Sequence, residues 1–304
     1  MNQRIPWGIV GSTTDDPDLT DDGVLALAKT WVEEYAVETG QYPGVRGAHY
    51  ALISLCAERG FEYRNTRDVY LTLSRFTAKL RRVGRFPSFE DLTRSIEVPL
   101  SFDGAERRLL SALASFRLDH TIGQPWQTYI VIEKRGLVGR VKRWTGHLGL
   151  RVVPLGGFGS ETIERKLKER IADDGRPSRA LVVSDFDPSG LFLPEVLQRH
   201  VGFDEVVRVA LTAEQVDELD LPTDPAPAKD SRRKRFIAET GRDVQVEVDA
   251  LDALHPGVLE EALLDAIEAE WDDDAYAEVL DREWREGWAV AIAHEFIQTN
   301  TRPV

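Results

Sequence analysis

The sequence predicts an α/β fold in which a helical N-terminal domain precedes a doubly wound, Rossmann-like parallel sheet and a helical C-terminal extension. Over the first 118 residues, apolar side chains recur every three or four positions, as on the buried face of a helix. From residue 126 to about residue 211, short apolar runs alternate with amphipathic stretches, which is typical of a parallel sheet covered by helices. We therefore predict an N-terminal domain over 1–120, a sheet domain over 125–225 and an acidic extension over 226–304.

Three helices are predicted in the N-terminal domain. The first begins after Thr20, whose hydroxyl can cap a helix, and the second covers about 45–57. The third follows Asn65, also a capping residue, and Gly84 ends it. Its apolar positions have helical spacing, namely Val69, Leu73, Phe76, Leu80 and Val83. Three short helices, the last of them basic, favour a winged-helix or helix-turn-helix unit that binds DNA.

Four apolar runs in the sheet domain are predicted as buried strands, and the stretches between them have helical periodicity. The runs are QTYIVIEK, LRVVPL, RALVVSD and EVVRVAL. A proline-rich connector, LPTDPAPAKDS, then leads to an extended piece, VQVEVDAL, and to two helices. The last helix has an apolar stripe with one residue every four positions, made of Leu280, Trp284, Trp288 and Ile292. We expect these helices to form a packing layer or a dimer surface.

The distribution of charge separates a basic front from an acidic back. The net charge is −14, yet residues 75–85 contain five cations and no acid. The single cysteine, Cys56, excludes an intrachain disulfide, and the six scattered histidines offer no zinc site. Apolar runs are too short for a membrane span, and the N-terminus lacks the features of a signal peptide. We expect a cytoplasmic protein with no membrane contact.

Three carboxylates follow two of the predicted strands. Glu133 ends the first strand, and Asp185 and Asp187 end the third. Because the carboxyl ends of parallel strands meet at one edge of a sheet, all three should converge there. Clustered carboxylates repel one another unless a cation neutralises them, and hard oxygen ligands suit Mg²⁺, with Mn²⁺ as a substitute. Asp187 also opens the tight turn DPSG at a helix start, which is a natural seat for a phosphate.

Two groups of residues in the N-terminal domain are candidates for DNA contact. Arg75, Lys79 and Arg82 form one stripe on the third helix, which can follow a phosphate backbone. Arg46 and Tyr50 lie four residues apart on the second helix, and the helical wheel places Tyr50 on the exposed face. A phenol beside a cation is a candidate nucleophile, since the cation favours the phenolate. A solvated stripe and an exposed structural tyrosine are the alternative interpretations.

An acid after the first strand and DxD after the third resembles the Toprim pattern of topoisomerases, primases and related nucleases. The chain is most similar to the topoisomerase VI A-subunit branch, which includes the meiotic double-strand-break proteins. IEKRGL (132–137), PLGGFGS (154–160) and SDFDPSG (184–190) carry the resemblance, and KDSR (229–232) and VEVDAL (246–251) support it. HYALISL and NTRDVYLTL resemble the helical front domain of that branch.

The resemblance implies Mg²⁺ at Glu133, Asp185 and Asp187, DNA as the substrate, and dimers with a DNA channel. RGAHY matches the arginine and nucleophilic tyrosine of the branch at Arg46 and Tyr50, but His49 stands where another aromatic residue is usual. The branch also implies a homodimer in which the tyrosine of one chain faces the metal site of the other. A separate ATPase subunit is a further partner that it implies.

We therefore expect Mg²⁺-dependent cleavage of DNA phosphodiester bonds. The nucleophile is open, because a Toprim nuclease would use water and a topoisomerase-like transesterase would use Tyr50. A non-catalytic DNA-binding regulator with a Toprim fold is one rival. An enzyme acting on another phosphodiester, such as a primase or an RNA nuclease, is a second rival, although the zinc-ribbon cysteines of primases are missing.

Overall fold

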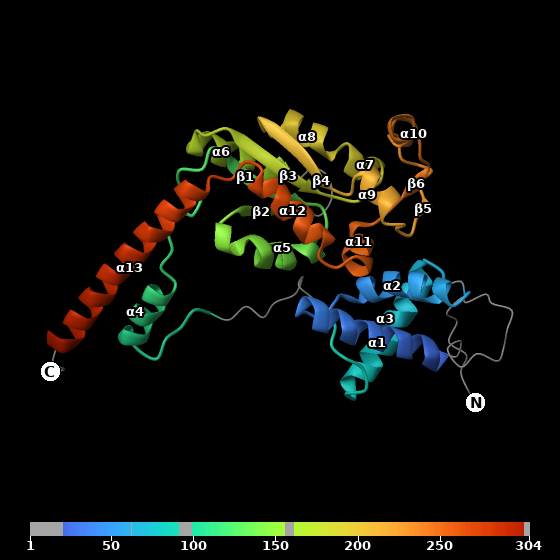
Figure 1. The fold of residues 1–304 in the computed structure, drawn as a ribbon, viewed down its shortest axis with the longest axis horizontal. Coiled ribbons are helices and arrows are strands. Elements are labelled where there is room, and N and C mark those ends of the chain that lie inside the picture. The colour runs from blue at the N-terminus through green and yellow to red at the C-terminus, as the bar shows by residue number, and fades with distance from the viewer. Residues whose placement is uncertain (1–20, 62, 91–98, 156–160, 301–304) are drawn as a thin grey trace.

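The N-terminal part of the protein is helical. The computed structural model describes residues 21–61, 63–90, 99–155 and 161–300, and begins with α1 (Asp21–Thr39), α2 (Val45–Glu58) and α3 (Arg67–Arg82) (Figure 1). These helices enclose a core of their own, with the buried side chains of Val24, Ala28, Val32, Ala48, Leu52, Cys56, Val69 and Leu73. The described residues before Gln127 contain no strand, so a wing remains a prediction. The predicted cap at Thr20 lies outside the described residues.

The two ends of α3 differ from the prediction. Thr66, and not Asn65, is the N-cap, and its hydroxyl accepts a hydrogen bond from the Val69 amide at 3.4 Å. Asn65 instead makes tertiary contacts, because its amide donates to Asp224 and its carbonyl oxygen lies 3.1 Å from His49 Nε2. Val83, predicted on the apolar face, is the C-cap residue and is largely exposed. Either Asn or Thr can cap a helix, so partners distant in sequence decided the outcome.

The predicted α/β architecture with a parallel sheet is confirmed. The strands are β1 (Gln127–Ile132), β2 (Arg151–Pro154), β3 (Ser178–Val183) and β4 (Glu205–Ala210), in the order β2-β1-β3-β4. All neighbouring strands in this sheet are parallel. Every residue of the two central strands, β1 and β3, is buried, which explains why their sequences are continuous apolar runs.

Helices cover both faces of the sheet, as the alternation of side chains along β1 and β3 requires. One face packs against α6 (Glu161–Asp174) and α8 (Leu193–His200), through Leu167 and Leu197. The opposite face packs against α5 (Val138–Thr145) and α12 (Val258–Glu268), through Val141 and Leu263. Two 3-10 turns, η2 (Arg135–Leu137) and η3 (Gly146–Leu148), flank α5. The first helix after β3, α7 (Pro188–Leu191), is a single turn.

The segment after β4 is more compact than predicted. It contains α9 (Ala213–Glu218), a two-stranded antiparallel pair of β5 (Asp224–Pro225) and β6 (Val244–Gln245), and α10 (Arg233–Thr240). The predicted extended piece VQVEVDAL is a strand only at its start, since α11 (Val248–Leu254) begins within it. The helix packs against α2, and Figure 1 shows it between the sheet and the front helices.

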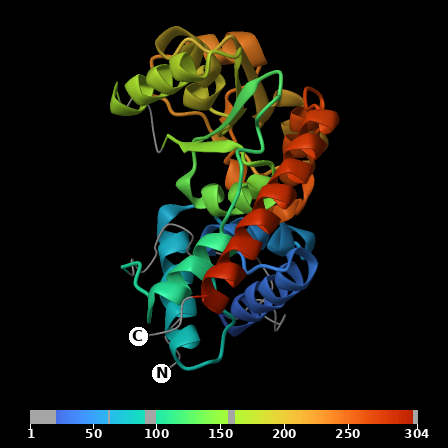
Figure 2. The ribbon, with the colours of Figure 1, turned by 90° about the vertical axis from the view of Figure 1, so that its left-hand side faces the viewer.

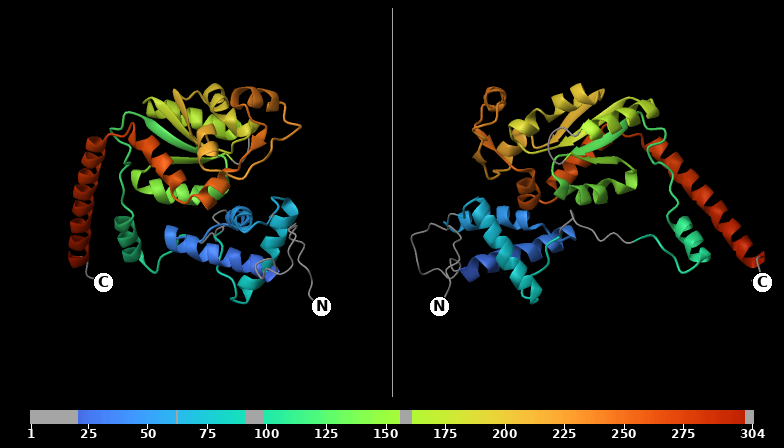
Figure 3. Two further views of the ribbon diagram at one scale, coloured as in Figure 1. Left: turned by 45° about the vertical axis from the view of Figure 1, so that its right-hand side comes forward. Right: turned by 180° about the vertical axis from the view of Figure 1, so that it is seen from behind.

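The last helix, α13 (Asp273–Asn300), leaves the sheet domain and runs beside α4 (Ala105–Ala114) (Figures 2 and 3). Its Glu283 carboxylate accepts hydrogen bonds from the Leu118 amide at 2.7 Å and lies 2.9 Å from His120 Nε2. Among the helices in the described part of the chain, none combines the length and apolar character that crossing a membrane requires.

Candidate functional site

The carboxyl ends of β1 and β3 bring Glu133 and the DxD segment together. The Glu133 amide donates to the carbonyl of Val183 at 3.0 Å, which continues the pairing of the two strands by one residue. The Asp185 amide then donates to Glu133 Oε2 at 3.4 Å. Glu133 and Asp185 therefore sit at the same edge of the sheet because two parallel strands end there in register.

Asp187 is built into the turn that follows. Its Oδ1 accepts a hydrogen bond from the Gly190 amide at 2.6 Å, so the side chain caps α7. A Cβ atom on Gly190 would lie 2.1 Å from the carbonyl oxygen of Asp185 and 3.2 Å from Ser184 Oγ. The turn closes on itself so tightly that only glycine fits at this position, which fixes the backbone between the two aspartates.

Arg208, on β4, holds this turn in place through hydrogen bonds to its backbone. Its guanidinium donates to the carbonyls of Asp185 at 2.7 Å and Leu211 at 2.6 Å, and also to the carbonyl of Gly190. Burial lowers the pKa of Arg208 to about 10, although nearby carboxylates oppose the shift. Arg208 is therefore a cation beneath the acids that holds backbone oxygens and leaves the carboxylates to other partners.

The Asp185 carboxylate points toward Lys134 rather than toward the other two acids. Lys134 Nζ lies 2.7 Å from Asp185 Oδ2 and also contacts Glu247, while the Val248 amide donates to Asp185 Oδ1 at 2.9 Å. Within the described residues, no three Asp, Glu, His or Cys side chains are arranged around a common point as metal ligands. The Asp185 carboxylate is thus paired with Lys134 and not gathered with the other two acids, and a metal site shared by the three stays a prediction.

The electrostatics of the cluster nevertheless favour a cation. Burial, followed by the charge of Asp187, raises the pKa of Glu133. Burial also raises the pKa of Asp187, although amides of the turn oppose it. For Asp185, burial and the charge of Glu247 outweigh Lys134 and raise the pKa. Partly buried carboxylates with raised pKa values lack full compensation for their charge, and their oxygens are the ligands Mg²⁺ prefers, so the donor set fits this ion.

Arg232 adds a cation at the outer side of the turn. Its guanidinium donates to Ser189 Oγ at 2.7 Å and forms an ion pair with Asp230 at 2.7 Å. The Asp230 carboxylate, with smaller contributions from the charges of Asp187 and Glu133, raises the pKa of Arg232. The turn DPSG therefore has both acids and an arginine close to it.

Tyr50 is buried, and the expected exposure of its phenol is wrong. Its side chain is 6% exposed and packs with Ala250 and Ala253 of α11. The helical wheel correctly predicts that Tyr50 lies outside the core of α1–α3. The face of α2 that carries Tyr50 is nevertheless covered, because α11 packs against it. Burial raises the pKa of Tyr50, and the charges of Glu247, Asp249 and Asp185 add to the rise while Arg46 opposes it. The cation at Arg46 therefore does not produce a phenolate.

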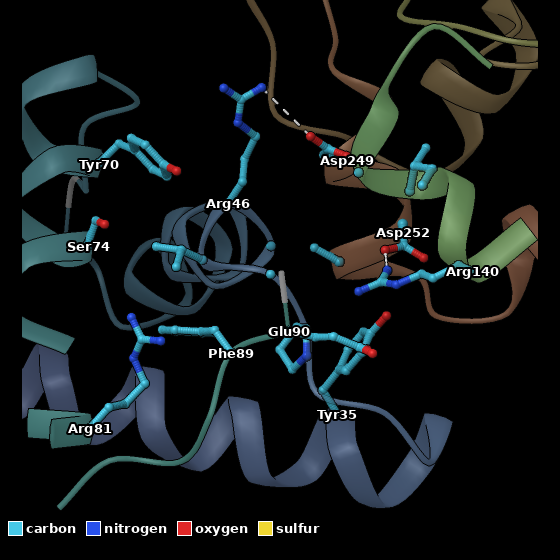
Figure 4. A pocket seen from close by; sticks show the side chains of 17 residues that line it. Tyr35, Arg46, Tyr70, Ser74, Arg81, Phe89, Glu90, Arg140, Asp249 and Asp252 are labelled. Carbon is cyan, nitrogen blue, oxygen red and sulfur yellow. Dashed lines mark ion pairs between the residues drawn. The ribbon is translucent and has the colours of Figure 1, made fainter. Parts of the chain in front are cut away.

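Arg46 links the front helices to α11. Its Nη1 lies 3.3 Å from Glu247 Oε2 and 3.7 Å from Asp249 Oδ2, and its guanidinium stands 5.8 Å from the Tyr70 ring (Figure 4). Arg46, Tyr70 and Asp249 line one side of a cavity of about 550 Å³ between the front helices and α5 and α11. Glu247 also contacts Lys134, so one carboxylate joins the front domain to the acid cluster.

His49 lies in an aromatic cluster inside the front domain. Its Nδ1 is 3.0 Å from Tyr63 Oη, and its ring contacts those of Tyr50, Tyr63 and Tyr70 at centroid distances of 5.3 to 5.7 Å. Burial lowers the pKa of His49 to about 4, with a hydrogen bond to Asn65 opposing the shift. His49 is therefore a neutral packing residue at neutral pH.

The α3 basic stripe, defined as Arg75, Lys79 and Arg82, lies on the exposed surface of α3. Within the described residues, none of its three cations forms an ion pair with a carboxylate. The stripe is on the side of the helix opposite the buried Val69 and Leu73. Its charges are consequently available to a ligand in solution.

The sequence analysis gave no individual role to four residues of the site. Lys134 stands directly after Glu133, and its position suggested nothing beyond the IEKRGL resemblance. Glu247 and Arg232 were noted only within the motifs VEVDAL and KDSR of the resemblance, while Arg208 comes from a strand with no distinguishing pattern. Of the PLGGFGS segment, residues 156–160 lie outside the described residues.

Comparison with known proteins adds no assignment, because no family model matches the chain and no curated protein matches it in sequence.

Proposed function

We propose that this protein cleaves phosphodiester bonds of DNA with Mg²⁺ or Mn²⁺ held by Glu133, Asp185 and Asp187. The observation that carries the proposal is that Glu133 and Asp185 lie side by side at the ends of β1 and β3, with Asp187 in the adjoining turn that only glycine can close. Such an edge of a parallel sheet is where ligands bind in open α/β folds. We assign the sheet to the Toprim class and the front helices to a winged-helix unit on the resemblance of their motifs.

Different residues of the site would have different roles at the phosphate. A divalent cation, when bound, supplies a Lewis acid that activates the attacking oxygen and stabilises the leaving oxygen. Arg232 and Ser189 stand where they can hold the non-bridging oxygens of a phosphate, since both lie at the turn. Arg208 keeps the turn rigid through its backbone contacts. Lys134, released from Asp185 by the cation, would be a further donor to the phosphate.

DNA is the proposed substrate because the α3 basic stripe is exposed and unpaired within the described residues, in a chain of net charge −14. Three cations on one helix face can neutralise phosphates of a nucleic-acid backbone. The acidic remainder of the surface would repel nucleic acid elsewhere, so the stripe also orients the substrate.

Water is favoured over Tyr50 as the nucleophile. The phenol is buried against α11, and burial raises its pKa, so Tyr50 is neither exposed nor ionised in this arrangement. Transesterification by Tyr50 would require α2 to separate from α11 of its own chain. If Tyr50→Phe cleaves DNA normally and the ends carry no protein, water is the nucleophile; loss of cleavage with metal binding intact would favour Tyr50.

A non-catalytic DNA-binding regulator is the second candidate. One observation favours it, namely that the Lys134 ammonium forms an ion pair with Asp185. In that case Lys134 would be a permanent structural cation, and the chain would bind DNA through the α3 basic stripe without cutting it.

The test is cleavage of supercoiled plasmid with Mg²⁺, followed by protease treatment before electrophoresis. Asp185→Asn with Asp187→Asn should abolish cleavage, and asparagine keeps the capping oxygen of α7. The matched control is Asp217→Asn with Glu195→Gln, which neutralises two carboxylates in exposed ion pairs outside the site. Undiminished cleavage by the site variant would refute the metal assignment, and DNA binding without cleavage by the unmodified protein would support the regulator.

A further inference from the structure

The C-terminal helix α13 carries an apolar surface that nothing in the described chain covers. Its side chains stand four residues apart, and their exposed fractions are 37% for Leu280, 68% for Trp284, 60% for Trp288 and 52% for Ile292. The two indole rings are parallel within 8°, with centroids 6.3 Å apart. We name these four residues the α13 stripe. Two exposed tryptophans in a row are unusual, because a large apolar patch normally marks a site of association.

The helix that runs beside α13 does not cover the stripe. α4 has no buried residue of its own, and its Leu109 and Leu110 are exposed as well. α4 approaches α13 on another side, where Phe116 lies 3.6 Å from the position that a Cβ atom on Gly287 would occupy. The two helices therefore form an arm with little core, and such an arm gains its stability from packing against a partner.

We infer that the α13 stripe binds the same stripe of a second copy of this chain, with the two helices antiparallel. The stripe is a palindrome about position 286, since Leu280 and Ile292 are equidistant from it, and so are Trp284 and Trp288. A two-fold axis at that point places each tryptophan against the other tryptophan of the partner, and each aliphatic residue against an aliphatic one. A two-fold contact requires this kind of self-complementarity.

The helix geometry specifies how the two copies cross. Residues four apart form a ridge inclined to the helix axis, and two such ridges interlock at a crossing angle of about −50°. Glu286, at the two-fold point, lies about 180° around the helix from the centre of the stripe, so no like charges face each other there. The antiparallel arrangement also opposes the two helix dipoles.

The sheet domain gives a further reason for the antiparallel direction. α13 starts against it, where Gly123 approaches Ala275 and Gln124 donates to the Asp272 carbonyl at 2.7 Å. A parallel partner would bring a second sheet domain to this same end of the helix. An antiparallel partner places the two domains at opposite ends. The inference does not depend on the cleavage activity.

The oligomeric state tests the surface. By sedimentation velocity, the unmodified protein should be a dimer, and Trp284→Glu with Trp288→Glu should be a monomer of unchanged helix content. The control is Val290→Glu, an exposed apolar residue on the opposite face of the same helix, which should remain a dimer. A monomeric unmodified protein, or a dimer that survives the double substitution, would overturn the inference and leave the stripe to a different kind of partner.

A distance measurement tests the orientation. A nitroxide at Asp274→Cys, in the first turn of α13, should lie about 35 Å from its copy in the antiparallel dimer and less than about 20 Å in a parallel one. Cys56 will not take the label, because it is buried and burial raises its pKa to about 11. A short distance would refute the antiparallel pairing.

Discussion

Replacing Lys134 by methionine tests whether the acid cluster binds a metal ion or whether Lys134 is its permanent structural cation. The ammonium stands between Asp185 and Glu247, and the side chain is 20% exposed. Methionine keeps the length and much of the packing of lysine but removes its charge. In the absence of metal, the variant leaves Asp185 buried, and among the described residues the Val248 amide is the one remaining hydrogen-bond donor to its carboxylate.

We expect the loss of this one charge to lower the free energy of unfolding substantially. Removing one partner of a buried ion pair typically lowers the free energy of unfolding by about 3 to 5 kcal/mol. Glu247 is 30% exposed and retains Arg46, so the lower end of that range, about 3 kcal/mol, applies here. A bound cation would take over the role of the ammonium, and at roughly a hundred times its dissociation constant it stabilises the folded state by about 2.7 kcal/mol.

The measurement is denaturant unfolding of both proteins, first with a chelator and then with Mg²⁺. We expect Lys134→Met to be strongly destabilised with the chelator and largely restored by Mg²⁺, with a smaller effect of the ion on the unmodified protein. Lys142→Met, which removes an exposed charge from α5, is the control and should change neither condition. If the variant is as stable as the unmodified protein with chelator, the ion pair is not stabilising; if Mg²⁺ stabilises neither protein, the metal site is wrong.

Three further predictions concern the surroundings of the site. The pKa of His49 lies near 4 in the folded protein and near 6.5 in the unfolded chain, so the unfolded state binds more protons between these values. The free energy of unfolding should thus fall by about 3 kcal/mol as pH drops from 6.5 to 4, and His49→Gln should flatten this dependence in urea titrations. Gly190→Ala should disrupt the turn and abolish cleavage, whereas Gly146→Ala, with open space around it, should leave activity intact; equal activities would contradict the clash. Neutralising the α3 basic stripe should weaken DNA binding on every sequence and reduce its salt dependence, and an unchanged salt slope would mean a solvated surface.

The strands and their acids could be predicted because local pattern determines them. β1 and β3 are buried on both faces, so their sequences are unbroken apolar runs, and the residues that follow must emerge at one edge. Glu133 and Asp185 needed no other information to be placed near each other.

Tertiary partners determined what the sequence did not predict. Tyr50 is buried by α11, which lies about 200 residues later in the chain, and no helical wheel of α2 contains that contact. Lys134 forms ion pairs with both Asp185 and Glu247, and Glu247 directly precedes α11. The Asp185 carboxylate is therefore directed to Lys134 and not to the other acids. Asn65 does not cap α3, because its side chain donates a hydrogen bond to Asp224. In each case the deciding group is far away in sequence and has no periodicity of its own.

The docking of α11 on α2 limits how the chain can be divided. A fragment that starts after the front helices would retain the whole sheet and its acids. It would also present Ala250 and Ala253 to water, and leave Glu247 and Asp249 without the guanidinium of Arg46. The boundary near residue 120 therefore does not separate two parts that are each stable alone. If the two halves are expressed separately, the sheet fragment should aggregate through its exposed α11 surface.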